Sequence, residues 1–212
     1  MRQETMSIYL FEELPEEIQR RAWEGDQSRH NFGDIDFWDF RATLDKFAEI
    51  FEITVKWEVD SSRYSFDFTM NPGQWGDLAE NLETIRDPLR LAAWVHNNRA
   101  HLIRKGKYYS TRGKWVNGKY NYKSRHSRVI FTYEDCPLTG VCFDMDILRA
   151  VIDCITYRRT FETYDDLMTT ALNEFFETWR AALEYAESLE FYAEEAAANE
   201  WEYTADGRRW PR

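Results

Sequence analysis

The sequence lacks the features that mark membrane, secreted and disulfide-bonded proteins. Its 212 residues contain no run of 18 apolar residues, so no segment is suited to cross a bilayer. The first residues do not have the apolar stretch and small-residue cleavage site of a secretory signal. Its 3 cysteines are an odd number for a disulfide framework. We therefore expect a cytoplasmic protein that has no membrane partner.

Catalytic motifs are also missing. The sequence contains no His-Glu-x-x-His, no Gly-x-Ser-x-Gly and no glycine-rich phosphate loop. His96 and His101 are five residues apart, a spacing that does not place two side chains on one face of a helix. We therefore predict that the protein is not an enzyme and has no cofactor.

No group of residues has the spacing of a metal site. Cys136 and Cys142 are not part of two closely spaced ligand pairs, so we interpret them, together with Cys154, as small buried side chains. Asp144 and Asp146 resemble a metal-binding pair, but an aspartate at the start of a helix more simply caps that helix. We predict no metal site.

Aromatic side chains and acidic charge are what the sequence has in quantity. It contains 9 Trp, 12 Tyr and 14 Phe, is 43% hydrophobic, and has a net charge of −11. Such a chain can bury a core that a disordered chain lacks, and its length suits one domain. Its acidity does not suit a general nucleic-acid binder, because such proteins usually carry a basic surface.

Apolar residues recur with helical spacing in several segments. Asp87 and Pro88 are suited to begin one helix that Gly106 ends, and Ser188 is suited to begin another. The expected helices cover residues 15–24, 37–51, 87–105, 144–155, 164–187 and 189–199.

Other segments have the period of two that strands show. Residues 53–59 and 64–70 predict a hairpin with its turn at residues 60–62. Asn117-Gly118 and Asp206-Gly207 are typical of tight turns. Further strands are expected at residues 108–111, 119–123 and 128–133.

The order of these elements predicts an α+β fold. We expect residues 1–212 to form a single domain, in which an antiparallel sheet of hairpins packs with N-terminal helices and a long C-terminal helix.

The charge of the chain is concentrated in two regions of opposite sign. Ten basic residues and no acidic one lie between Arg99 and Arg128, which leaves −21 on the rest of the chain. In the predicted hairpin at residues 107–128, Tyr and Trp alternate with Lys and Arg, a combination that binds single-stranded nucleic acid. An ordinary surface hairpin, or one that neutralises acidic helices of the same chain, explains the pattern as well. The candidate binding residues are Lys107, Tyr109, Arg112, Lys114, Trp115, Lys119, Tyr120, Tyr122, Lys123 and Arg125.

The helical C-terminal part, residues 144–201, is the acidic region. From Glu162 to Glu202 there are twelve acidic residues and one basic residue, Arg180. Such a helix face is usually a solvated surface, but carboxylates in a row can also imitate phosphates and occupy the basic channel of a nucleic-acid-binding protein. The candidate residues for this contact are Glu184, Glu187, Glu190, Glu194 and Glu195.

Both ends of the chain resemble small accessory proteins of bacteriophages and integrated mobile elements. The C-terminal resemblance rests on residues 185–188 and 194–209, with the run Asn-Glu-Trp-Glu-Tyr-Thr-Ala-Asp-Gly-Arg-Arg. The N-terminal resemblance rests on residues 9–22, and a looser one on residues 105–109. The resemblance implies expression in the cytoplasm of a bacterial host cell and a role against host defence, as in anti-CRISPR proteins. It carries over no active site.

Two functions follow as hypotheses. In the first, the protein is a non-enzymatic, phage-encoded inhibitor that binds a nucleic-acid-handling protein of bacterial immunity, such as the CRISPR effector Cas9, through a DNA-mimicking acidic surface. In the second, it binds single-stranded DNA or RNA directly through residues 107–128. The sequence favours no oligomeric state.

Overall fold

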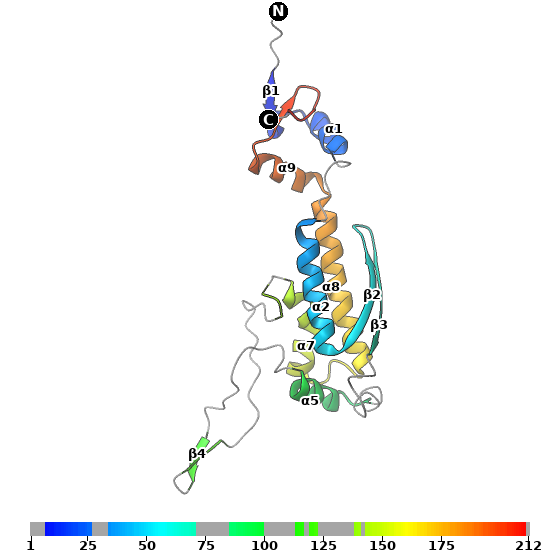
Figure 1. Ribbon diagram of the computed structural model, residues 1–212, viewed down its shortest axis with the longest axis vertical. Coiled ribbons are helices and arrows are strands. Elements are labelled where there is room, and N and C mark those ends of the chain that lie inside the picture. The colour runs from blue at the N-terminus through cyan, green and yellow to red at the C-terminus, as the bar shows by residue number, and fades with distance from the viewer. Residues whose placement is uncertain are drawn as a thin grey trace, which may run out of the picture. The chain divides into compact units, whose positions relative to one another are not determined.

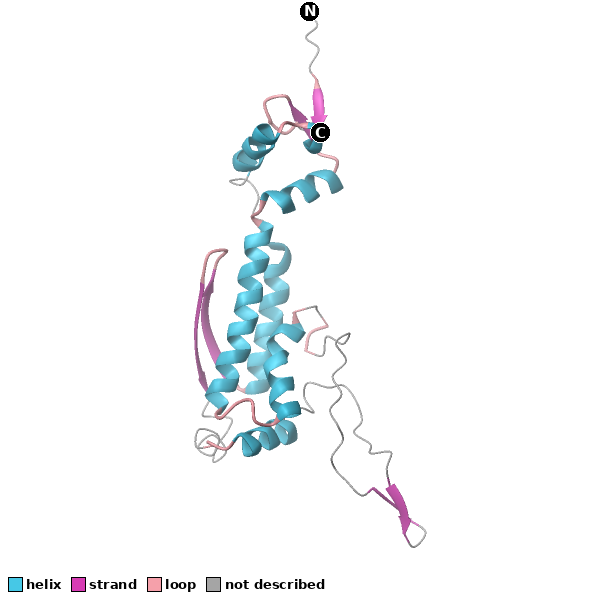
Figure 2. Cartoon of the chain, turned by 180° about the vertical axis from the view of Figure 1, so that it is seen from behind, coloured by secondary structure: helices cyan, strands magenta, loops and turns pink. Residues whose placement is uncertain are grey.

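The structure is a computed structural model that describes residues 7–26, 34–70, 85–99, 113–116, 119–122, 138–140 and 143–210. Helices are its main element, and short antiparallel strand pairs accompany them (Figures 1 and 2). The fold class is therefore α+β, as predicted.

The helices lie close to their predicted positions. They are α1 (Glu16–Asp26), α2 (Asp34–Phe51), α5 (Pro88–Asn98), α7 (Asp144–Tyr157), α8 (Tyr164–Ala186), α9 (Leu189–Ala198) and a short 3-10 helix, η1 (Phe11–Glu13). Ser188 caps α9 as expected, because its hydroxyl accepts the N–H of Phe191 at 3.1 Å. α5 ends earlier than predicted, with Arg99 as its C-cap. Among the described helices, none combines the length and the apolar composition that a bilayer crossing requires.

The described strands form three two-stranded sheets. β2 (Ile53–Val59) and β3 (Tyr64–Met70) are the predicted hairpin, and β4 (Gly113–Val116) pairs with β5 (Lys119–Tyr122). The expected strands at residues 108–111 and 128–133, and the expected turn at residues 117–118, lie outside the described residues. The third pair was not predicted: β1 (Ile8–Leu10) runs antiparallel to β6 (Glu202–Thr204), near the other end of the chain.

The chain divides into two compact units. The terminal unit comprises residues 1–38, 58–65 and 176–212, and the central unit comprises residues 39–57 and 66–175. The division runs through α8 and through the β2–β3 hairpin, so it does not separate two consecutive segments of chain. The single-domain expectation stays a prediction.

Aromatic side chains on helical stripes form the core of the central unit. Phe40, Phe47 and Phe51 of α2 are completely buried, as their helical spacing predicted. The ring of Phe40 stacks on that of Phe143, with centroids 3.7 Å apart, and meets the ring of Phe175 on α8 edge-on at 5.6 Å. Burial of each such ring contributes about 2–3 kcal/mol, so this side of α2 ties it to α8.

A buried carboxylate joins α2, the loop at residues 138–140, and α7. Asp144 is completely buried and accepts backbone N–H groups of Leu138, Thr139 and Gly140 at 2.8, 2.7 and 3.2 Å. The hydroxyl of Thr43 on α2 donates to the same carboxylate at 2.9 Å. These hydrogen bonds satisfy a charge that would otherwise be costly to bury.

The role of Asp144 differs from the one predicted. α7 begins at Asp144 as expected, but Phe143 occupies the N-cap position and Asp144 accepts hydrogen bonds from the preceding loop. Sequence spacing alone does not distinguish a carboxylate that caps its own helix from one that holds a loop.

We expect Asp144→Asn to destabilise the protein by about 2–4 kcal/mol, because an amide removes the charge and turns a donor toward some of the N–H groups. Urea unfolding monitored by circular dichroism measures the change. Asp146→Asn, two residues along the same helix, is the matched control. Burial raises the pKa of Asp146, so its neutral form already costs little, and the change should stay within about 0.5 kcal/mol. Equal effects of the two substitutions would contradict the structural role of Asp144.

Cys154 is a buried side chain, as predicted. It lies on α7 with 2% of its surface exposed, and burial raises the pKa of its thiol to about 12. Cys136 and Cys142 lie outside the described residues.

We expect Cys154 to resist alkylation in the folded protein, because the thiol is protonated and shielded from reagent. In a variant with Cys136→Ser and Cys142→Ser it is the only thiol, so mass spectrometry after iodoacetamide treatment measures it directly. Modification in native buffer as fast as in denaturant would show that the side chain is accessible.

Candidate functional site

The basic hairpin is described in its two strands. Their register places Trp115 opposite Tyr120 and Lys114 opposite Asn121. Lys119 and Tyr122 lie at the two ends of β5. The other candidates of this surface lie outside the described residues: Lys107, Tyr109, Arg112, Lys123 and Arg125. Nucleic-acid binding by this segment stays a prediction.

The acidic candidates do not form one continuous row on a single helix. Glu184 lies on α8, where Arg180 pairs with it at 2.8 Å and with Glu177 at 2.7 Å. Glu187 follows the end of α8, and its backbone carbonyl accepts the indole N–H of Trp23 on α1 at 3.2 Å. Arg180 therefore compensates part of the acidic charge of α8.

The three remaining acidic candidates lie on α9. The hydroxyl of Tyr185 donates to Glu194 at 2.7 Å, and the pKa of Tyr185 is raised first by this hydrogen bond and further by the charge of Glu190. Glu195 accepts the side-chain amide of Asn199 at 3.3 Å. Within the part of the chain that the structure describes, Glu190, Glu194 and Glu195 form no ion pair. Acidic charge is thus least compensated on α9.

The two ends of the chain share one core in the terminal unit. The ring of Phe11 meets those of Tyr192 and Tyr203 at centroid distances of 5.2 and 5.5 Å. The buried residues of this core are Phe11, Leu14, Ala22, Tyr192, Ala196 and Tyr203. The N-terminal and C-terminal segments that carried the sequence resemblance therefore fold against each other.

The turn after β6 packs closely on α1. Gly207 has a φ of +86°, which confirms the predicted Asp206-Gly207 turn. A Cβ atom at Gly207 would lie 3.1 Å from both Cγ2 and the carbonyl oxygen of Ile18. The position therefore requires glycine twice, for its backbone conformation and for its close approach to the helix.

An apolar groove with an acidic rim lies in the terminal unit. It has a volume of about 400–500 Å³ and is lined by Leu10, Phe11, Glu12, Gln19, Ala193, Glu194, Ala196, Ala197 and Glu200. These lining residues include three carboxylates and no Lys or Arg. Ile8 and Leu10, on the same face of β1, are 42% and 41% exposed and extend the apolar surface. Of the five acidic candidates, Glu194 is the one that lines the groove.

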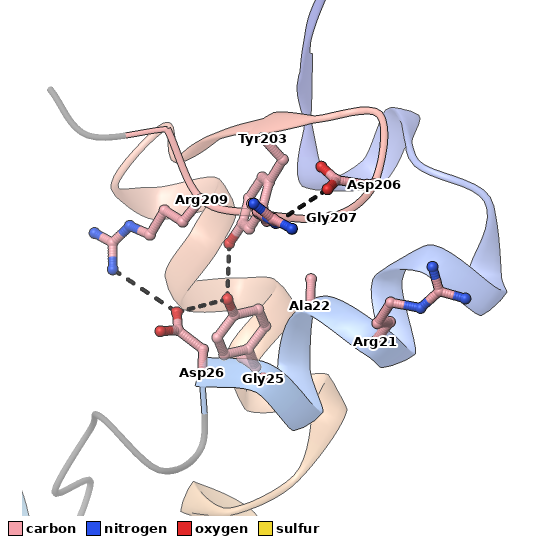
Figure 3. Close-up of a pocket in the computed structure, with 10 residues that line it drawn as sticks. Arg21, Ala22, Gly25, Asp26, Tyr203, Asp206, Gly207 and Arg209 are labelled. Carbon is pink, nitrogen blue, oxygen red and sulfur yellow. Dashed lines mark hydrogen bonds and ion pairs between the residues drawn. The ribbon is translucent and has the colours of Figure 1, made fainter.

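A cavity of about 610 Å³ lies between α1, α9 and the turn after β6 (Figure 3). It is lined by Arg21, Ala22, Gly25, Asp26, Tyr192, Tyr203, Asp206, Gly207, Arg208 and Arg209. Sequence analysis did not single out these residues, because they come from opposite ends of the chain. The neighbouring arginines after the Asp206-Gly207 turn were the one local signal.

A chain of hydrogen bonds forms one wall of this cavity. The hydroxyl of Tyr203 donates to that of Tyr192 at 3.0 Å, which donates to the carboxylate of Asp26 at 2.9 Å. The guanidinium of Arg209 lies 4.0 Å from the same carboxylate and 3.7 Å from the ring centre of Trp201. Burial is the main cause that raises the pKa of both tyrosines, so they stay protonated and act as hydrogen-bond donors.

Metal binding has no support in the described residues. Within the ranges that the structure describes, no three His, Cys, Asp or Glu side chains are placed to hold a metal ion.

Comparison of the chain with protein-family models, with curated proteins and with solved structures finds no match in any of the three. The phage origin and the anti-defence role therefore stay predictions. The argument about function rests on the groove and the cavity themselves.

We expect Gly207→Ala to destabilise the protein by about 1–3 kcal/mol, because alanine is strained at this φ and its Cβ meets Ile18. Gly25→Ala is the matched control on α1, where an added Cβ meets nothing within 4 Å. Alanine suits a helix better than glycine, so the control should raise the stability by up to about 1 kcal/mol. Urea unfolding measures both, and a neutral Gly207→Ala would contradict the packing of the turn on α1.

Proposed function

We propose that the protein acts by binding another protein, and that the acidic groove of the terminal unit docks a basic, partly apolar segment of that partner. The observation that carries the proposal is the combination in one groove of an apolar floor with carboxylates from η1, α9 and the residues after α9. An apolar floor favours side chains over water, and the carboxylates select Lys and Arg around them.

The electrostatics of the surrounding surface support a cationic partner. Glu190, Glu194 and Glu195 form no ion pair among the described residues, so their charge acts outward. An acidic surface attracts a basic protein at long range and accelerates its association. Proteins that handle nucleic acid carry basic channels, which makes them the partner class we propose.

The resemblance to phage and mobile-element proteins makes the proposal more specific. We propose that the partner is a protein of bacterial immunity in the cytoplasm of the host cell, such as the CRISPR effector Cas9. Inhibition would follow if the acidic groove occupied a basic surface that the effector needs for its target DNA.

We expect a labelled amphipathic peptide of Leu and Lys residues to bind the protein, and binding to weaken as salt is raised. Glu12→Lys with Glu194→Lys should weaken it by about tenfold or more, because like charges then face each other in the groove. Fluorescence anisotropy measures the affinity. Glu58→Lys with Asp67→Lys is the control, because both residues are exposed on strands, neither lines the groove, and the change in net charge is equal. An equal loss in both variants would leave only a general charge effect and refute the groove.

The same variants test the proposed target. With purified Cas9 and guide RNA, the protein should reduce the association of labelled target DNA, and the groove variant should do so less well than the control variant. Unchanged association at several-fold excess of protein would contradict this target. A shift of labelled single-stranded DNA by the protein alone would support direct binding through residues 107–128 instead.

A further inference from the structure

The cavity of the terminal unit gathers basic side chains within an acidic surrounding. In the described part of this unit, the basic residues are Arg20, Arg21, Arg63, Arg180, Arg208 and Arg209. Half of them, Arg21, Arg208 and Arg209, line this one cavity. Guanidinium groups are the usual ligands of phosphate and carboxylate oxygens, and the cavity volume is that of a small-molecule site.

The two carboxylates in the cavity already have partners. Asp26 accepts the hydroxyl of Tyr192 at 2.9 Å and lies 4.0 Å from Arg209. Asp206 accepts the hydroxyl of Thr204, and this hydrogen bond is the main cause that holds the pKa of Asp206 below its usual value. Both carboxylates are therefore engaged without help from Arg21.

Arg21 is the cation whose charge the cavity does not compensate. It forms no ion pair with any residue that the structure describes. Figure 3 shows Arg21 on α1, on the other side of Ala22 from Arg209. An anionic group that enters the cavity therefore meets positive charge from both sides.

Arg208 adds a second charge that a ligand can recruit. Its ion pair with Asp206 measures 3.1 Å, but the two side chains are 86% and 54% exposed. An ion pair so exposed contributes little stability, so a bound anion can replace Asp206 as the partner of Arg208.

We propose that the cavity binds the phosphate group of a small phosphomonoester, such as a nucleoside monophosphate, with Arg21 and Arg208 as its principal charges. A phosphomonoester carries close to two negative charges at neutral pH, which matches two recruited guanidinium groups better than a carboxylate does. Ala22, Gly25 and the tyrosine rings provide an apolar wall for the rest of the molecule. The proposal is independent of the acidic groove.

Isothermal titration calorimetry with AMP tests the proposal. AMP should bind, and adenosine, which lacks the phosphate, should bind about tenfold more weakly or worse. Arg21→Gln should lower the affinity for AMP by about tenfold, and Arg21→Gln with Arg208→Gln should lower it further. Both residues are exposed, so the variants should fold, which circular dichroism checks.

Arg20→Gln is the matched control. Arg20 precedes Arg21 on α1, is also exposed, and does not line the cavity, and its replacement removes the same charge. The control variant should bind AMP as the wild-type protein does. Absence of AMP binding, equal binding of adenosine, or equal losses in the Arg20 and Arg21 variants would each overturn the proposal.

Discussion

The packing of Phe11 against Tyr192 and Tyr203 is the contact on which the terminal unit depends. These three rings bring a residue near the N-terminus together with two near the C-terminus, and the hydroxyl groups of the tyrosines continue the contact as hydrogen bonds to Asp26 on α1. Apolar burial and satisfied polar groups thus occur in the same few side chains. Without this contact, neither the groove nor the cavity would have its walls.

α9 serves both concave surfaces of the terminal unit. Tyr192 lines the basic cavity, whereas Ala193 and Ala197 line the acidic groove. Because one rigid helix contributes to both surfaces, a ligand in the cavity and a partner in the groove would meet the same element. The small side chains on the groove side leave its floor open, and the large aromatic side chain on the other side fills the core.

Local patterns in the sequence predicted local structure and failed for contacts between distant segments. Periodicity identified α2, α8 and the β2–β3 hairpin, because the spacing of apolar residues follows directly from the geometry of each element. The β1–β6 pair was missed, since strands of three residues have too short a pattern to detect and no turn joins them. The same reason hid both concave surfaces. The acidic row was predicted from spacing alone, which does not reveal that Arg180 already pairs with Glu184.

The pairing of β1 with β6 also orders the events of folding. β1 leaves the ribosome early, whereas its partner strand is made only after the whole central unit has been synthesised. Ile8, Leu10 and Phe11 therefore remain without their native partners during most of translation, when exposed apolar segments are open to aggregation and to chaperones. The central unit, whose residues emerge first, is able to form beforehand, and completion of the terminal unit then marks the end of synthesis.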